Sequence, residues 1–167
     1  METVHRLLHA AREALDLSQT DVAKATGVST RTIHRMESEQ GIVGFDILGK
    51  LRSHFESLGV TLVAPVEREK WAITFSTELA PPPSPDAADD LYHPVPGRVL
   101  RAARVLAGLT QAELAARSSI AHTTVRRLEK GGSVGAEKVY VLQRSIEEQG
   151  VEFVKPLRER PWWTLRR

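Results

Sequence analysis

The chain of 167 residues contains two copies of one 21-residue pattern. The stretch LSQTDVAKATGVSTRTIHRME occupies residues 17–37, and LTQAELAARSSIAHTTVRRLE occupies residues 109–129. At an offset of 92, residues 7–38 share ten identical positions with their counterparts. After a one-residue slip the match resumes, as GVTLVAP at 59–65 against GVEFVKP at 150–156. The repeat therefore covers each half of the chain and predicts two copies of one fold.

A proline-rich segment separates the two copies. Six of the nine prolines lie in PPPSPDAADDLYHPVP, residues 81–96. Because proline fixes φ and lacks a backbone N–H, this segment can continue neither a helix nor a central strand. We therefore expect a first domain at 1–80, a linker at 81–96 and a second domain at 97–167.

Hydrophobic periodicity predicts four helices and a β-hairpin in each half. The helices expected in the first half are 3–15, 19–26, 30–38 and 44–58, and the strands lie in GVTLVAP and WAITFST. In the second half the expected helices are 97–107, 111–118, 122–130 and 136–149, and the strands are 151–155 and 161–166. A lone hairpin is not stable by itself, so each hairpin must pack on its helices or pair with the other.

The repeated stretch carries the end signals of two short helices joined by a tight turn. Ser18 is the expected N-cap of the first helix, and Val22 is expected to face inward from it. Gly27 supplies the positive φ that ends this helix, Val28 fills the corner, and Ser29 is the expected cap of the second helix. The pattern predicts a helix-turn-helix unit.

The second helix of this unit has an apolar face and a cationic face. At about 100° per residue, Ile33 and Met36 point to one side, away from a row of hydrogen-bond donors. Such a helix fits the major groove of B-DNA, where Arg donates to guanine O6 and N7 and where Thr or His reaches base edges or phosphates. The candidate reading residues are Thr30, Arg31, His34 and Arg35, and in the second half His122, Thr123, Arg126 and Arg127.

Apolar positions keep their type between the copies, whereas reading positions change. Three of the four reading residues differ between the halves, while Ile33 and Met36 become Val125 and Leu128. The sequence therefore predicts one scaffold used twice with different reading surfaces.

The motif resembles the helix-turn-helix of the phage repressor and Cro family, also called the XRE-type family. The first copy has a Gln that opens the first short helix, A-x-x-x-G-V-S across the turn, and I-x-x-x-E at the end of the second helix. This resemblance implies a mainly α fold with two lambda-repressor-like four-helix domains, each followed by a β-hairpin.

The resemblance also implies roles for single residues. In that family the Gln contacts a DNA phosphate from a helix N-terminus, and base contacts come from the start and the sixth position of the recognition helix. An Arg of the first helix is buried against the last Glu of the motif. The positions that carry over are Gln19 and Gln111 for phosphate, Thr30, Arg31, Arg35, His122, Thr123 and Arg127 for bases, and Arg12–Glu37 and Arg104–Glu129 for the structural ion pair.

The second copy departs from the family pattern at two positions. Ser119 stands where the turn has Gly, and Ala121 stands where the recognition helix has its Ser cap. A left-handed conformation at a residue other than Gly costs about 1 kcal/mol, and the loss of a cap costs about as much. We expect the second unit to be looser or to be held by packing.

Charge is distributed unevenly along the chain. Residues 1–80 carry nine Lys and Arg against eleven Asp and Glu, whereas residues 98–167 carry fourteen against seven. Since phosphate neutralisation supplies most non-specific affinity for DNA, the second half is better equipped for it. In the first half, we expect the acidic residues Asp16, Asp21 and Glu39 to lie near the DNA groove that its recognition helix would enter.

Two functions remain open at this level. The first is a sequence-specific transcriptional regulator, a repressor of the kind common on mobile elements, which binds double-stranded DNA as a monomer or a homodimer. The second is a protein-binding antiactivator or antirepressor that uses the helix-turn-helix scaffold to sequester a regulatory protein. The sequence favours the DNA-binding regulator, and the acidic balance of the first half is what keeps the protein-binding function open as the alternative, above all for that half.

Other classes of protein fit the sequence poorly. The six histidines lack the spacing of metal ligands, and His34 near Ser29 has no acid to complete a nucleophilic site. We expect no enzyme, no metal and no cofactor. The absence of Cys is compatible with the cytoplasm, and no apolar run is long enough to cross a bilayer. The expected location is the cytoplasm, with no membrane partner.

Overall fold

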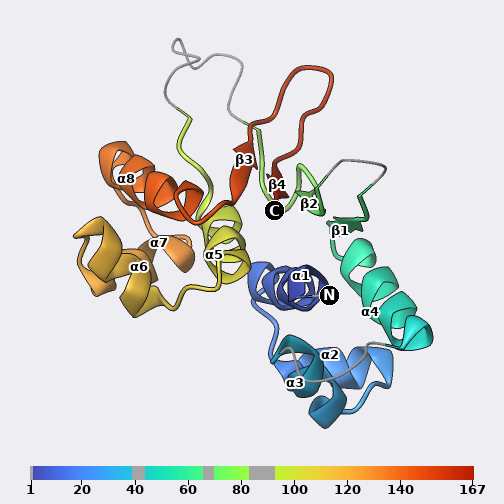
Figure 1. Ribbon diagram of the computed structural model, residues 1–167. Coiled ribbons are helices and arrows are strands. Elements are labelled where there is room, and N and C mark those ends of the chain that lie inside the picture. Colours follow the sequence, from blue (N-terminus) through green and yellow to red (C-terminus); the bar gives the residue numbers. More distant parts are fainter. Residues whose placement is uncertain (1, 39–43, 66–69, 83–92) are drawn as a thin grey trace.

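The computed structural model describes residues 2–38, 44–65, 70–82 and 93–167. These residues form eight helices and four strands (Figure 1). The first half contains α1 (Glu2–Ala14), α2 (Gln19–Thr26), α3 (Thr30–Glu37), α4 (Phe45–Ser57), β1 (Val60–Val63) and β2 (Ala72–Phe75). The second half contains α5 (Gly97–Leu106), α6 (Gln111–Ser118), α7 (His122–Glu129), α8 (Ala136–Glu147), β3 (Glu152–Val154) and β4 (Thr164–Arg166).

This element order confirms the predicted fold class, a mainly α protein with two helix-turn-helix units and β-hairpins. Most of the predicted linker, residues 83–92, lies outside the described residues, as does Glu39. Among the described residues, no helix is long and apolar enough to cross a membrane.

Local signals set the ends of the short helices. Ser18 caps α2 by accepting from the backbone N–H of Asp21, whose side chain accepts from the Ser18 N–H in return. Thr110 and Glu113 form the same capping box at the start of α6. α2 ends at Gly27, whose φ of 71° lies in the left-handed region that glycine adopts without strain.

The two central helices, α1 and α5, pack against each other and join the halves (Figure 1). α5 is buried almost all round, since Val99, Leu100 and every residue from 102 to 106 are buried. A helix that is buried on all sides belongs to the interior of a protein. One hydrophobic core therefore runs through both halves instead of stopping at the linker.

The two hairpins pair with each other to form one antiparallel sheet with the strand order β1-β2-β4-β3. β2 and β4 are the central strands, with Ile73 opposite Leu165 and Thr74 opposite Thr164. Thr164 is the repeat counterpart of Ile73, and Leu165 that of Thr74, so each cross-strand pair is the two-fold mate of the other. This is the self-complementary pairing of a symmetric dimer, formed here within one chain.

The copies differ where the first helix meets the recognition helix. In the first half, Nδ1 of His5 donates to the carbonyl oxygen of Met36 and bridges α1 to α3. The repeat counterpart of His5 is Gly97, and a Cβ atom there would lie 1.9 Å from the carbonyl oxygen of Leu128. The backbone of α5 therefore approaches α7 more closely than any larger residue would allow.

Candidate nucleic-acid interface

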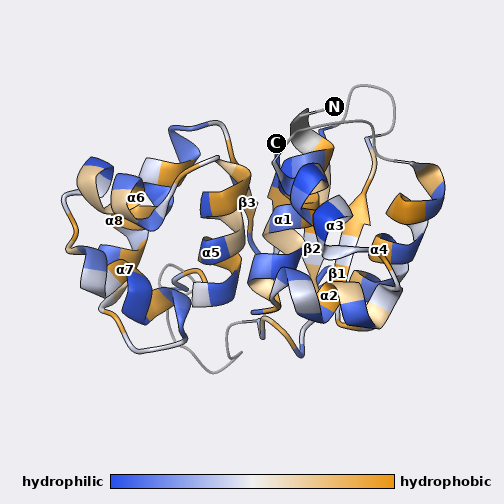
Figure 2. Ribbon diagram, turned by 90° about the horizontal axis from the view of Figure 1, so that it is seen from below, coloured by the Kyte–Doolittle hydropathy of each residue, from blue (hydrophilic) through white to orange (hydrophobic). Residues whose placement is uncertain are grey.

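The two helix-turn-helix units, α2–α3 and α6–α7, lie on different flanks of the α1–α5 pair (Figure 1). The four-stranded sheet lies above that pair in the same view. Both units come into view from below, where α3 and α7 carry strongly hydrophilic segments (Figure 2). The two halves are joined by the α1–α5 packing and by the β2–β4 pairing. Neither of these contacts involves the recognition helices α3 and α7.

The predicted reading faces of both recognition helices are open to solvent. In α3, Ile33 is 3% and Met36 5% exposed, so these two side chains anchor the helix in the core. In α7, Val125 and Leu128 are buried in the same way. The exposed residues on the opposite side are Thr30, Arg31, His34 and Arg35 in α3 and His122, Thr123, Arg126 and Arg127 in α7.

The caps of the two recognition helices differ. Ser29 accepts from the backbone N–H of Thr32 at 3.1 Å and closes the first turn of α3. Ala121, at the matching position, gives α7 no side-chain cap. Ser119 adopts the left-handed conformation with a φ of 55°, where the first half has Gly27. The second turn is therefore built from residues that lack both local advantages of the first.

In the first half, Arg12 of α1 holds the end of α3 through a bidentate contact. Its Nε and Nη2 donate to the carboxylate of Glu37 at 2.6 and 2.9 Å, and its Nη1 donates to the Leu17 carbonyl oxygen at 2.7 Å. Glu37 also accepts from Nε2 of Gln19 at 2.8 Å. Burial disfavours the charged form of Arg12, but the hydrogen bond and charge of Glu37 raise its pKa nonetheless.

The second half repeats this arrangement with Arg104 and Glu129. Nε and Nη2 of Arg104 donate to Glu129 at 2.6 and 3.0 Å, and Nη1 donates to the Leu109 carbonyl oxygen at 2.7 Å. Nε2 of Gln111 donates to Glu129 at 2.7 Å. Glu129 ends α7, so this cluster fixes the recognition helix to α5 and α6 at once.

Gln19 and Gln111 are half-buried and direct their amide nitrogen at the motif Glu. A side-chain amide nitrogen carries two N–H groups, and each of these contacts uses one of them. The backbone N–H groups at the N-termini of α2 and α6 lie beside the same residues, and such ends attract anions. The amide group is therefore held beside an end of the helix that suits a phosphate.

The halves also contact each other through charged side chains that the repeat does not share. Arg101 of α5 binds Glu13 and Asp16 of the first half, with an N–O distance of 2.6 Å to each. The repeat counterparts of Arg101 and Glu13 are His9 and Val105, so the ion pair occurs on one side only of the pseudo-two-fold axis. Sequence reasoning overlooked Arg101 and Glu13, although a cation and a carboxylate that each lack a counterpart in the other copy were a visible signal. It named Asp16 only as an acidic residue near the DNA, whereas the structure pairs Asp16 with Arg101.

Acidic side chains near the first unit are engaged in structural contacts. The contact with the His9 ring, followed by the hydrogen bond and charge of Arg101, lowers the pKa of Glu13 to about 2 against the opposing effect of burial. Hydrogen bonds from the Ser18 side chain and backbone lower the pKa of Asp21. Of the acidic residues that the sequence analysis placed near the DNA, Asp16 forms an ion pair with Arg101, and Asp21 takes part in the cap of α2.

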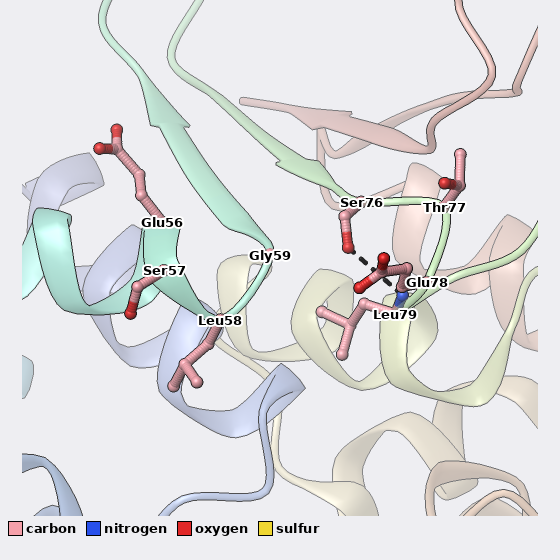
Figure 3. Close-up of a pocket in the computed structure, with 8 residues that line it drawn as sticks. All are labelled: Glu56, Ser57, Leu58, Gly59, Ser76, Thr77, Glu78 and Leu79. Atoms are coloured by element: carbon pink, nitrogen blue, oxygen red, sulfur yellow. Dashed lines mark hydrogen bonds between the residues drawn. The ribbon is translucent and has the colours of Figure 1, made fainter.

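A separate pocket lies where α4 leads into β1 and where the chain leaves β2 (Figure 3). Glu56 and Ser57 line it on one side, and Ser76 and Glu78 on the other. Oγ of Ser76 accepts from the backbone N–H of Leu79 at 3.3 Å. The described residues that line this pocket include two carboxylates and no cation, so its chemistry is the opposite of that of a phosphate site.

The helix-turn-helix family model matches residues 8–59 and 100–145, which is more than half of the chain. The protein therefore belongs to the helix-turn-helix family, of the XRE-like Cro/C1 type, in two tandem copies. Members of this family are DNA-binding transcription regulators and are typically not enzymes. Neither a comparison with curated proteins nor one with solved structures finds a match.

Proposed function

We propose that this protein is a sequence-specific repressor whose single chain reads two different DNA half-sites, one with α3 and one with α7. The observation that carries the proposal is the exposure of all eight reading side chains on helices whose opposite sides are buried in a common core. The domains 1–80 and 97–167 are the two reading units. Gln19 and Gln111 are the proposed phosphate contacts that set the position of each unit on the duplex.

One chain with two reading units does the work that a homodimer does in symmetric repressors. The β2–β4 pairing and the α1–α5 packing hold the units together, so binding of one raises the effective concentration of the other at its half-site. Because three of the four reading residues differ between α3 and α7, the preferred site has two unlike halves and no dyad symmetry. Repression follows when such a site overlaps a promoter.

The experiment begins with selection of binding sites from a random duplex pool by the purified full chain. Affinity for the selected site is then measured by fluorescence anisotropy over a series of salt concentrations. The double variant Arg126→Ala/Arg127→Ala should lose about 1–3 kcal/mol of binding free energy for each base contact removed, and its salt slope should fall by about 1 for each phosphate contact removed. The matched control, Arg144→Ala/Arg158→Ala, removes the same charge from α8 and from the β3–β4 connection, neither of which belongs to a recognition helix.

Unchanged affinity and salt dependence in the Arg126/Arg127 variant would contradict the proposal. The excess of acidic residues in the first half supports a second candidate, in which that half binds a regulatory protein. A pool that yields no enriched sequence, with only weak and salt-sensitive duplex binding, is the result expected for that alternative. Recovery of one half-site, altered by α7 variants and not by α3 variants, would assign DNA to the second half alone.

A further inference from the structure

The outer face of the four-stranded sheet carries a cavity of about 360 Å³ to which both halves contribute. Lys70 and Thr74 line it from the first half, and Arg160, Trp162, Thr164 and Arg166 line it from the second. The sheet lies on the other side of the α1–α5 pair from the α2–α3 unit (Figure 1). None of the described residues that line the cavity belongs to α3 or α7, so the cavity is distinct from the proposed DNA-reading faces.

The floor of this cavity follows from the alternation of side chains along the strands. Ile73, Phe75 and Leu165 are fully buried on the inner face. Their neighbours Thr74 and Thr164 face outward and lie opposite each other across the β2–β4 junction. Both threonine side chains therefore lie on the outer side of the sheet, at the β2–β4 junction where the two halves join.

Two residues that line this cavity each have a buried polar atom without a hydrogen-bond partner among the described residues. Thr164 is only 4% exposed, and its Oγ1 has no partner. Nε of Arg160 is likewise buried and unpaired, although Nη2 of the same guanidinium donates to the Lys155 carbonyl oxygen at 3.3 Å. Buried polar groups in folded proteins are nearly always hydrogen-bonded, so a hydroxyl and a cationic N–H left without partners beside one cavity indicate a missing acceptor.

The charge of the lining indicates what kind of acceptor is missing. Among the described residues of the lining, Lys70, Arg160 and Arg166 are cations, and Glu152 is the one carboxylate. Glu152 lies 3.7 Å from Arg166, which leaves an excess of positive charge. A planar guanidinium offers N–H donors in a fixed geometry that suits a carboxylate or a phosphate. Trp162, with 39% of its surface exposed, adds an aromatic face at the same cavity.

We propose that this cavity binds a small aromatic anion, whose carboxylate or phosphate group accepts from Arg160 and Thr164 while its ring lies against Trp162. Pockets that bind small molecules combine apolar walls with a few polar groups that fix the orientation of the ligand, and a cavity of this size falls in their usual range. A ligand there contacts both halves, so it stabilises their junction. The site does not depend on DNA binding, and its test needs no DNA.

The test uses the full chain and four probes: benzoate, phenyl phosphate, inorganic phosphate and neutral benzyl alcohol. Isothermal titration calorimetry and thermal unfolding should show that benzoate or phenyl phosphate binds at millimolar concentration and raises Tm. The anion that binds more tightly identifies the head group. Benzyl alcohol, which lacks the charge, and inorganic phosphate, which lacks the ring, should bind more weakly.

Two variants locate the binding. Thr164→Val keeps the shape of the side chain and favours a strand, and Arg160→Gln removes the charge; each should weaken binding of the preferred anion on the order of tenfold. Arg144→Gln, which changes an arginine with an 83% exposed side chain on α8, should leave the affinity unchanged. The proposal is overturned if neither aromatic anion binds, if benzyl alcohol binds as well as they do, or if Thr164→Val and Arg160→Gln both bind like the unaltered chain.

Discussion

Replacement of Glu129 by alanine tests how the recognition helix of the second half is held. Glu129 is 3% and Arg104 7% exposed, and together they form two hydrogen bonds of 2.6 and 3.0 Å. Without the carboxylate, the Arg104 guanidinium remains buried without its counter-charge, and Gln111 loses the acceptor of its amide N–H. Breaking a buried pair from one side costs about 3–5 kcal/mol, because the remaining charge is not compensated.

The first half supplies an internal comparison. In Glu37→Ala, Arg12 would keep the carboxylate of Glu13, which lies 3.0 Å from its Nη1. The expected loss is therefore smaller, about 1–3 kcal/mol. The control is Glu148→Ala, which breaks a 3.6 Å pair with Arg144 whose side chains are 63% and 83% exposed. Such a surface pair contributes less than about 1 kcal/mol.

The assay is urea unfolding followed by far-UV circular dichroism and by tryptophan fluorescence. Because both halves share one core, the two signals should change together, which allows a single free energy of unfolding to be fitted. The expected order of the losses is Glu129→Ala, then Glu37→Ala, then Glu148→Ala. A loss in Glu129→Ala no larger than that in Glu148→Ala would refute the account of the buried pair.

A double replacement separates the cost of breaking the pair from its net contribution. Arg104→Met/Glu129→Leu removes both charges and fills their volume with apolar groups. Exchanges of this kind are often neutral or stabilising, so the double variant should recover most of the stability that Glu129→Ala loses. A double variant as unstable as the single one would show that the destabilisation comes from packing and not from the unpaired charge.

Three further predictions concern the turn, the reading face and the junction between the halves. Ser119→Gly should raise the free energy of unfolding by about 1 kcal/mol, because the left-handed φ of 55° is strained for serine; Ala121→Ser should add a similar amount by capping α7. The triple variant Thr30→His/Arg31→Thr/His34→Arg gives α3 the reading residues of α7, so sites selected by this variant should become palindromic. Glu13→Gln should lose about 1–2 kcal/mol at neutral pH after allowance for solvent screening, measured by urea unfolding.

The pH dependence of the Glu13 effect has a definite sign. Its pKa is lowered from the ordinary 4.5 to about 2 in the folded protein. The stability that it contributes is therefore fully present above pH 4.5, and it declines as the pH falls from there towards 2. The difference in unfolding free energy between the unaltered chain and Glu13→Gln should shrink over that interval. A difference that stays constant would contradict the lowered pKa.

The predictions for Ser119→Gly and for the triple variant of α3 each have a result that would contradict them. Ser133→Gly serves as a control for Ser119→Gly, because it makes the same exchange at an exposed position without a positive φ, and it should not stabilise the protein. If Ser119→Gly is no more stable than the unaltered chain, the turn is not strained. If the triple variant of α3 still selects an asymmetric site, the exposed face of α3 does not choose bases.

Much of the local structure could be predicted from the sequence. The ends of α2 follow from the Ser18–Asp21 capping box and from the left-handed Gly27. Each of these signals involves residues only a few positions apart, so it is visible in the sequence. The helical spacing of apolar residues separates the buried Ile33 and Met36 from the exposed reading residues of α3. The repeat strengthened these predictions, because the same helix-end signals and apolar positions occur in both copies.

Periodicity and caps act over a turn or a strand, so local sequence signals were enough to predict the helices and hairpins of the described residues and the surfaces that α3 and α7 turn outward. Packing of the two halves against each other is what pairs β2 with β4, brings Arg101 to Glu13, and places Thr164 and Arg160 beside one cavity. These contacts join residues about 90 positions apart in sequence or meet only when the strands are in register. Local propensity does not encode such partners, since they depend on which surfaces fit together once both halves have folded.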